Sequence, residues 1–243
     1  MSTPPPTGRV DLLLVAPSTA EFCTFPVETA EFDLVANRMV GSVRNGGQVI
    51  GADVRSPSFR RGAAVLNRQS VSLISDTDLD HISAGLELDP RACLDGLRAM
   101  GAAHVDTDGV DVAAHTARLE GLDDGEAARL FLAQCLGINV VVGGFEGSGA
   151  VADFLALPAG VDFGPYDLAR RRFTDAAVVV TRVNTPCASP GKMIEKYYPR
   201  PVGGLAKRFV RVAQGHRGYV GMVAKGGTMT QGEPIGFVPF GDR

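Results

Sequence analysis

Cysteine is the residue type in this chain whose placement most strongly suggests chemistry. The chain contains four cysteines, none of them in a C-x-x-C pair, at positions Cys23, Cys93, Cys135 and Cys187. Their low number and wide spacing argue against a disulfide framework and favour a reducing compartment. Cys93 and Cys135 fall on the apolar faces of predicted helices, so we expect both in the core, and we expect Cys23 to be structural.

Cys187 has a different setting, in the segment VNTPCASPGK that follows an apolar strand. Ser189 and Pro190 are typical of a helix start, so the sequence predicts a helix N-terminus just after the cysteine. Exposed amides at that terminus, together with Arg182 and Lys192, would favour the thiolate. A thiolate is both a nucleophile and a soft metal ligand, so the sequence leaves both roles open. The alternative is a small buried apolar residue.

A second candidate site is an arginine-rich segment between residues 44 and 69. Guanidinium groups bind phosphate in a bidentate manner, and glycines in the same segment let backbone amides approach an anion. The alternative interpretation is a solvated, charged loop. The residues of interest in this segment are Arg55, Arg61, Asn67 and Arg68.

Composition limits the function classes. The chain has 243 residues, a hydrophobic fraction of 45% and a formal net charge of -3, which argues against non-specific nucleic-acid binding. The apolar run Val10 to Ala16 contains Asp11 and is too short for a signal sequence or a membrane span. We therefore expect a cytoplasmic protein whose partners include neither nucleic acid nor membrane, and whose ligand is a small anionic cofactor or substrate.

The elements that must position these residues are strands at both ends of the chain and helices in the middle. Residues 1–8 are predicted to be a disordered tail and residues 9–243 a single domain. The order of elements is not the regular alternation of a doubly wound fold. The sequence predicts a mainly β fold, a β-barrel with a helical insertion at about residues 89–135 and peripheral helices, α+β overall. The expected strands are 9–16, 64–65, 70–74, 138–142, 176–182 and 219–224, followed by a final strand near the C-terminus, and the expected helices are 76–85, 90–100, 126–136 and 204–213.

Five motifs in order resemble the MOSC domain family, named for the C-terminal domain of molybdenum cofactor sulfurase. The resemblance runs from about Val10 to Val238, interrupted by the helical stretch. The matching elements are Arg55 with Arg61-Gly62 and Asn67-Arg68-Gln69, Leu136-Gly137-Ile138-Asn139, Asn184-Thr185-Pro186-Cys187, Arg217-Gly218-Tyr219-Val220-Gly221, and Gly226-Gly227 with Gly232-Glu233.

The resemblance implies a β-barrel-like fold, a pocket for the pterin phosphate of molybdenum cofactor (molybdopterin), and one essential cysteine, which Cys187 matches. That cysteine either carries sulfur as a persulfide or ligates molybdenum. In the first case the sulfur comes from a partner cysteine desulfurase that uses pyridoxal phosphate. In the second, the enzyme reduces a small N-oxygenated substrate with a redox partner. The expected cofactor-binding residues are Arg55, Arg61, Asn67, Arg68, Asn139, Lys192 and Arg217.

An alternative of another class is a non-catalytic binding or assembly module that keeps the barrel. It is motivated by Ser42 and Ile138, which stand where many relatives have acidic residues. The apolar faces of the insertion are compatible with a homodimer.

Three other patterns are weak. Residues His104 to His115 resemble a cation loop, but histidines occupy the positions where an EF-hand needs Asp and Glu, so an Asp-rich turn is expected. Residues 147–152 imitate a dinucleotide fingerprint followed by a helix that Pro158 shortens. His81, one turn after Asp78, is expected to form an ordinary surface pair. Among the histidines, only His216 is retained as a candidate site residue.

Overall fold

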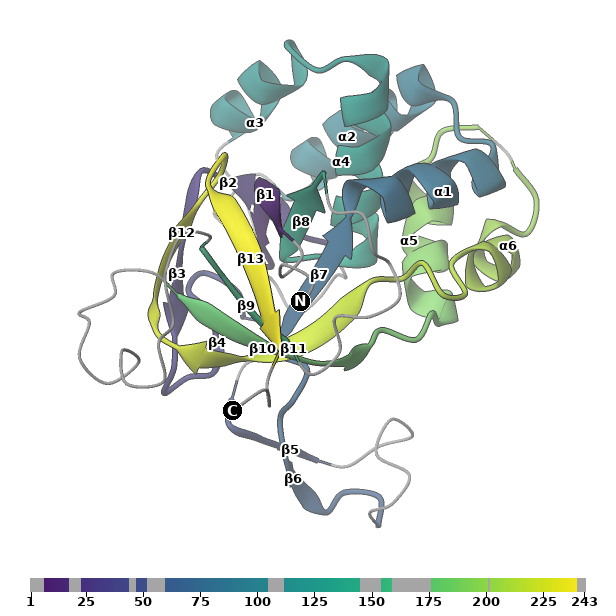
Figure 1. Cartoon of the computed structure of the whole chain (residues 1–243). Helices are drawn as coiled ribbons and strands as arrows, with labels where there is room; N and C mark the ends of the chain where they lie inside the picture. Colours follow the sequence, from purple (N-terminus) through teal and green to yellow (C-terminus); the bar gives the residue numbers. More distant parts are fainter. Residues whose placement is uncertain are drawn as a thin grey trace, which may run out of the picture.

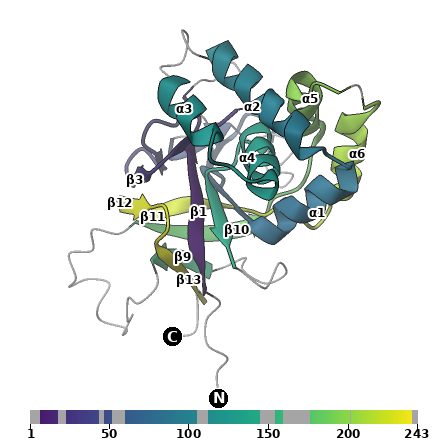
Figure 2. The same cartoon turned by 90° about the horizontal axis from the view of Figure 1, so that it is seen from above.

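The computed structural model describes residues 7–17, 23–43, 47–51, 60–104, 112–144, 154–158, 176–200 and 202–239. Helices gather on one side of a large β-sheet in both views of the molecule (Figures 1 and 2). The strands are β1 (Thr7–Val15), β2 (Phe25–Val27), β3 (Thr29–Asp33), β4 (Arg38–Met39), β5 (Val49–Gly51), β6 (Ala64–Leu66), β7 (Val71–Ser75), β8 (Val140–Gly143), β9 (Phe154–Pro158), β10 (Ala177–Val183), β11 (Tyr219–Lys225), β12 (Gly227–Thr230) and β13 (Pro234–Pro239). The helices are α1 (Asp76–Leu86), α2 (Pro90–His104), α3 (Val112–Leu119), α4 (Asp124–Leu136), α5 (Ala188–Tyr197) and α6 (Leu205–Val212).

The main sheet has eight strands in the order β13-β9-β10-β11-β7-β8-β1-β2. β13 pairs with β9 on one side and with β1 on the other, so the order of pairings returns to its starting point. The pair β7–β8 is parallel, and the other pairs are antiparallel. Two smaller sheets, β12-β3-β4 and β5-β6, complete the β structure.

β7 and β8 are buried along their whole length, on both of their faces. Ile74 and Val141 belong to the core between the sheet and the helices, whereas Leu73 and Val140 belong to a second core on the opposite face. Successive side chains of a strand point to opposite faces, so each strand contributes to both cores. This explains why β8 appears in the sequence as a continuous apolar run rather than as an alternating pattern.

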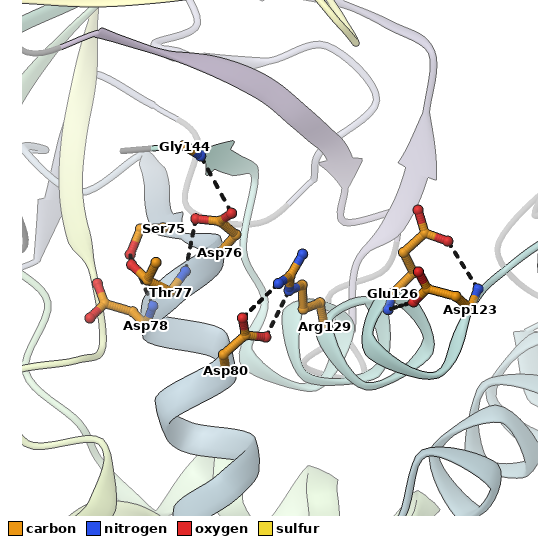
Figure 3. A network of polar contacts seen from close by, with 9 residues as sticks. All are labelled: Ser75, Asp76, Thr77, Asp78, Asp80, Asp123, Glu126, Arg129 and Gly144. Carbon is orange, nitrogen blue, oxygen red and sulfur yellow. Dashed lines mark hydrogen bonds and ion pairs between the residues drawn. The ribbon is translucent and has the colours of Figure 1, made fainter. Parts of the chain in front are cut away.

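Polar contacts fix the starts of the two helices closest to these strands (Figure 3). Ser75 ends β7 and caps α1, where its hydroxyl accepts a hydrogen bond from the amide of Asp78 at 3.0 Å. Asp123 caps α4 in a reciprocal arrangement with Glu126, in which each side chain accepts from the other residue's amide. Such caps satisfy amides that would otherwise lack partners.

The mixed α+β class expected from the sequence is confirmed, and several boundaries shift. β1 begins at Thr7 because Thr7 and Gly8 pair with Gly236 and Ile235, so the predicted tail ending at residue 8 was too long. The described residues of the insertion expected at about residues 89–135 include α2, α3 and most of α4, which ends at Leu136. The prediction of a helix just before Pro158 was wrong, because residues 154–158 form strand β9, which lies between β10 and β13.

Among the described residues, none of the helices has the length and apolar character needed to cross a membrane.

Candidate functional site

The four cysteines divide sharply by exposure. Cys23, Cys93 and Cys135 are buried, and Cys187 is exposed. Burial raises the pKa of the Cys93 thiol to about 12 and also raises that of Cys135, so both thiols stay protonated. Since the thiolate is the reactive form, Cys187 is the cysteine whose position is suited to reaction with another molecule.

Cys187 is itself the N-cap of α5, so the helix begins at Ala188, two residues before the predicted start at Pro190. Its backbone is extended, with φ -133° and ψ 171°, and its side chain makes no capping hydrogen bond. The first amides of α5 therefore lie next to a thiol that is not used to cap them, and such amides favour negative charge nearby.

Arg217 is a buried charged residue with an electrostatic link to this thiol. It is only 4% exposed, and its Nη2 donates to the carbonyl oxygen of Leu136 at the end of α4. Its Nη1 has no hydrogen-bond partner among the described residues. Burial lowers the pKa of Arg217 to about 10, and negative charge on Cys187 acts in the opposite direction. This attraction links the buried guanidinium to the cysteine site.

The chain brings Cys187 and Arg217 together through Gly218. The amide of Asn184 donates to the carbonyl oxygen of Gly218 at 2.8 Å, which ties the segment before Cys187 to the start of β11. Gly218 has φ +72°, and a Cβ there would lie 2.1 Å from the carbonyl oxygen of Leu73. Only glycine fits this close approach to β7.

Asn67 and Asn139, two of the predicted cofactor ligands, are engaged within the fold. The Nδ2 of Asn139 donates to the carbonyl of Leu14 at 3.2 Å, and its Oδ1 accepts from Ser72. The Nδ2 of Asn67 donates to the carbonyl of Gly47 at 3.0 Å, and its Oδ1 accepts from the amide of Gln69. Both asparagines are buried, and they hold together strands and turns that are far apart in sequence. Their role as cofactor ligands stays a prediction.

The other predicted cations are exposed. Arg68 lies three residues before the start of β7, and its carbonyl oxygen accepts from the hydroxyl of Thr181 at 2.6 Å. This contact places Arg68 beside β10, the strand that leads to Cys187. Lys192 lies on α5. Arg61 precedes β6, which pairs with β5 in a hairpin that projects from the body of the molecule (Figure 1). Arg55 lies outside the described residues.

The prediction for His81 and Asp78 was wrong. Asp78 is buried, and its Oδ1 lies 2.8 Å from Nδ1 of His216, which is 138 residues away in sequence. His81 stacks on His216 with ring centroids 3.7 Å apart. The sequence could not show this because the partner comes from the turn after α6. His216, the histidine retained as a candidate, comes directly before Arg217 in the chain. Its side chain, however, contacts Asp78 and His81 of α1.

The two histidines of the cation-loop pattern also pack in the interior of the protein. His104 and His115 are both buried and contact the ring of Phe25, at centroid distances of 5.2 and 5.8 Å. The acidic residues between them lie outside the described residues. So do the glycines of the dinucleotide-like motif.

The site that this fold presents is an exposed thiol at a helix N-terminus. The strand β10 of a mixed sheet leads to it, and the buried Arg217 accompanies it. The family model of the MOSC domain matches residues 109–236, more than half of the chain and including both Cys187 and Arg217, so the chain belongs to the MOSC domain family.

Individual relatives agree over almost the whole chain. A Bacillus subtilis (strain 168) protein described as "Putative metal-sulfur cluster biosynthesis proteins YuaD" is 26% identical over 233 residues, covering 94% of this chain and 89% of that protein. The crystal structure of YuaD from Bacillus subtilis superposes with a TM-score of 0.65 at 22% identity, covering 97% of both chains, and shows the same fold.

Proposed function

We propose that this protein carries sulfane sulfur on Cys187 as a persulfide and transfers it to an acceptor in the assembly of a metal-sulfur centre or cofactor. The observation that carries the proposal is the exposure of Cys187 at the N-cap of α5, while the other three thiols are buried. Membership of the MOSC family supports it, and so does the description of the YuaD relative, which refers to metal-sulfur cluster biosynthesis.

The loading step is balanced without an external oxidant. The thiolate of Cys187 attacks the terminal sulfur of a persulfide on the donor, R–S–SH. A sulfur–sulfur bond forms to Cys187 as the bond within the donor breaks, which gives Cys187–S–SH and releases R–S⁻. In the second step an acceptor thiolate attacks the same terminal sulfur and the thiolate of Cys187 leaves. No net oxidation or reduction of the protein occurs in the complete transfer.

The residues around Cys187 favour both steps for the same reason. Cys187 is a thiolate at the start of the first step and again as the leaving group of the second, and the α5 amides and Arg217 favour that charge. Side reactions with the other cysteines are suppressed, because Cys93 and Cys135 are buried and protonated. Cys23 is also buried.

A second candidate function uses the same thiol as a ligand to molybdenum. The donor set fits this group: an exposed thiolate is a soft ligand, and the orphaned Nη1 of buried Arg217 lies in the same region. Cys187 would hold the metal, and exposed Arg68 and Lys192 are the cations that would hold the phosphate of the pterin. When bound, molybdenum cofactor supplies oxygen-atom transfer, the chemistry needed to reduce an N-oxygenated substrate.

The test of the sulfur-carrier proposal loads the purified protein from a cysteine desulfurase with cysteine, and then measures sulfane sulfur released by cyanide as thiocyanate. We expect close to one equivalent for the wild type and for Cys23→Ala, and none above background for Cys187→Ser. Cyanide-releasable sulfur that survives Cys187→Ser would refute the proposal.

A parallel measurement separates the alternatives. Metal analysis and the fluorescence of oxidised pterin on protein expressed with excess molybdate would both be positive for a molybdenum enzyme. A protein that is negative in these assays and also fails to load sulfur would be a non-catalytic module.

A further inference from the structure

Two cavities meet at Arg118, on the side of the molecule that carries α3. The first, of about 430 Å³, lies between β1, α4 and the turn joining β12 to β13. The second, of about 840 Å³, lies beside β2 and α3. Arg118 and Gln231 line both cavities, and neither cavity is lined by Cys187 or Arg217. α3 and α5 are well separated in both overall views (Figures 1 and 2), so this region is distinct from the thiol site.

In the first cavity two arginines pair with carboxylates, whereas neither Arg118 nor Glu126 forms an ion pair among the described residues. Arg9 pairs with Asp11 at 2.9 Å, and Arg129 forms a bidentate pair with Asp80 at 2.6 and 2.7 Å (Figure 3). The carboxylate of Glu126 accepts from the amide of Asp123 in the cap of α4. Each of these charged groups therefore already has a partner in the protein.

Arg118 has a neutral partner instead. It is half-buried, and its Nη2 donates to Oε1 of Gln231, whereas no carboxylate among the described residues forms an ion pair with it. Burial lowers the pKa of Arg118, and the charge of exposed Glu28, which lines the second cavity, acts in the opposite direction. Removing a guanidinium from water without an anionic partner costs free energy, so an anion placed here would gain both charge pairing and hydrogen bonds.

The second cavity supplies apolar surface next to that cation. Its walls include Val15, Phe25, Pro26, Val27 and Ala114. The other titratable groups that face it are Glu28 and His115. Burial lowers the pKa of His115, with Arg118 acting in the same direction, so this histidine is neutral near pH 7. Its Nε2 lies 3.2 Å from the carbonyl of Leu97. Arg118 is thus the cation of the second cavity as well.

We infer that this pair of cavities binds an amphiphilic monoanion, in which a carboxylate pairs with Arg118 and an alkyl chain lies against the apolar wall of the second cavity. The second cavity is mainly apolar with a few polar groups, and cavities of this size and composition are typical of small-molecule sites. The second cavity is large enough for an alkyl chain of medium length.

The test uses octanoate as the probe with the full-length protein, by isothermal titration calorimetry. We expect saturable binding with one site, and binding weaker by at least about tenfold for Arg118→Gln, since a hydrogen bond to a charged group is lost. Arg98→Gln is the matched control, because Arg98 is an exposed arginine of α2 that pairs with Asp95 and lines neither cavity. It should bind octanoate as the wild type does.

Two further probes separate the charged head from the chain. Acetate tests the head alone and 1-octanol tests the chain alone, and both should bind at least about tenfold more weakly than octanoate. Acetate binding as tight as that of octanoate would show that the apolar wall is not used, and 1-octanol binding as tight would show that Arg118 is not used. Either result would overturn the inference, as would unchanged binding by Arg118→Gln.

A measurement on the wild type does not depend on the folding of a variant. In NMR spectra, octanoate should give intermolecular contacts to the ring of Phe25 and the methyl groups of Val27. Contacts confined to other regions would contradict the site. Cys187→Ser should bind octanoate normally, so failure of this inference and failure of the sulfur-carrier proposal give different results.

Discussion

At the scale of single residues, the environment of each cysteine separates structural thiols from the candidate site. The sequence correctly placed Cys93 and Cys135 in the core, because helical spacing shows which face is apolar. It also placed Cys187 near a helix start, because Ser-Pro is a recognisable start signal. The sequence could not show that Arg217 is buried, because that arginine contacts Leu136, 81 positions away in the chain.

Arg217 should affect the reactivity of Cys187 without touching another molecule. We predict that Arg217→Met slows alkylation of Cys187 by iodoacetamide at neutral pH by about threefold to tenfold, because a buried positive charge that favours the thiolate is removed. The rate is measured by mass spectrometry of the peptide containing Cys187. Arg211→Met, at an exposed arginine of α6, is the control and should react at the wild-type rate. Equal rates for all three proteins would show that Arg217 does not act on the thiol.

The buried thiol of Cys93 should make the stability of the folded protein depend on pH in the alkaline range. Its pKa is raised by burial from an ordinary value of 9.0 to about 12, so between these pH values the unfolded chain loses a proton that the folded chain keeps. The free energy of unfolding should therefore fall as pH rises from 9 to 12, with a contribution of at most about 1.4 kcal/mol per pH unit from this group. Urea unfolding at several pH values measures the slope.

The comparison protein for this measurement is Cys93→Ala. Its stability should be lower near neutral pH because a buried side chain is shortened, and its slope between pH 9 and 12 should be shallower. An identical slope in the two proteins would contradict the assignment to Cys93.

At the scale of elements, helix starts are held by specific side chains. Asp123 caps α4 in a reciprocal pair with Glu126, so Asp123→Ala should lower the free energy of unfolding by about 1 kcal/mol and the Tm by about 2–4 °C. Asp124→Ala is the control, because Asp124 lies in the same turn without a capping bond and should have a smaller effect. A loss as large for Asp124→Ala would mean that charge near the helix end, rather than the cap, stabilises α4.

The pairing of α5 with α6 depends on a glycine close to the candidate site. A Cβ on Gly191 would lie 2.5 Å from Cα of Ala206, so the two helices pack with their backbones close together. Gly191→Ala should force α5 and α6 apart and lower the free energy of unfolding by about 1–3 kcal/mol, measured by urea unfolding. Gly203→Ala is the control, because a Cβ at Gly203 has no neighbour within 4 Å. If the two variants are equally stable, the close approach is not important.

Elements that are strongly patterned were the easiest to predict. The helices α1, α2 and α4 and the strands β7, β8, β10 and β11 were all expected within a few residues of their boundaries, because their apolar spacing and their turn residues agree. The short strands β2, β3 and β4 and the strand β9 were not expected. They are short, and their stability comes from pairing with distant strands: β3 with β12, and β9 with β10 and β13.

At the scale of the whole molecule, the pairing of β1 with β13 explains why the two ends of the chain matter to the site. β1 pairs with β13, and Gly232 donates back to the carbonyl oxygen of Val10. The core inside the sheet therefore includes residues from both ends, such as Leu13 and Phe237, together with Val180 of the strand that leads to Cys187. Long-range pairings of this kind leave little local signal in a sequence, whereas the family motifs indicated the fold class directly.

The central claim is that Cys187, and not another cysteine, carries sulfur. The most direct measurement is peptide mapping by mass spectrometry of the wild-type protein after loading from a cysteine desulfurase and trapping of persulfides by alkylation. We predict one additional sulfur atom on the peptide containing Cys187 and none on the peptides containing Cys23, Cys93 and Cys135. An unmodified Cys187 after loading, or sulfur found on one of the buried cysteines instead, would contradict the account.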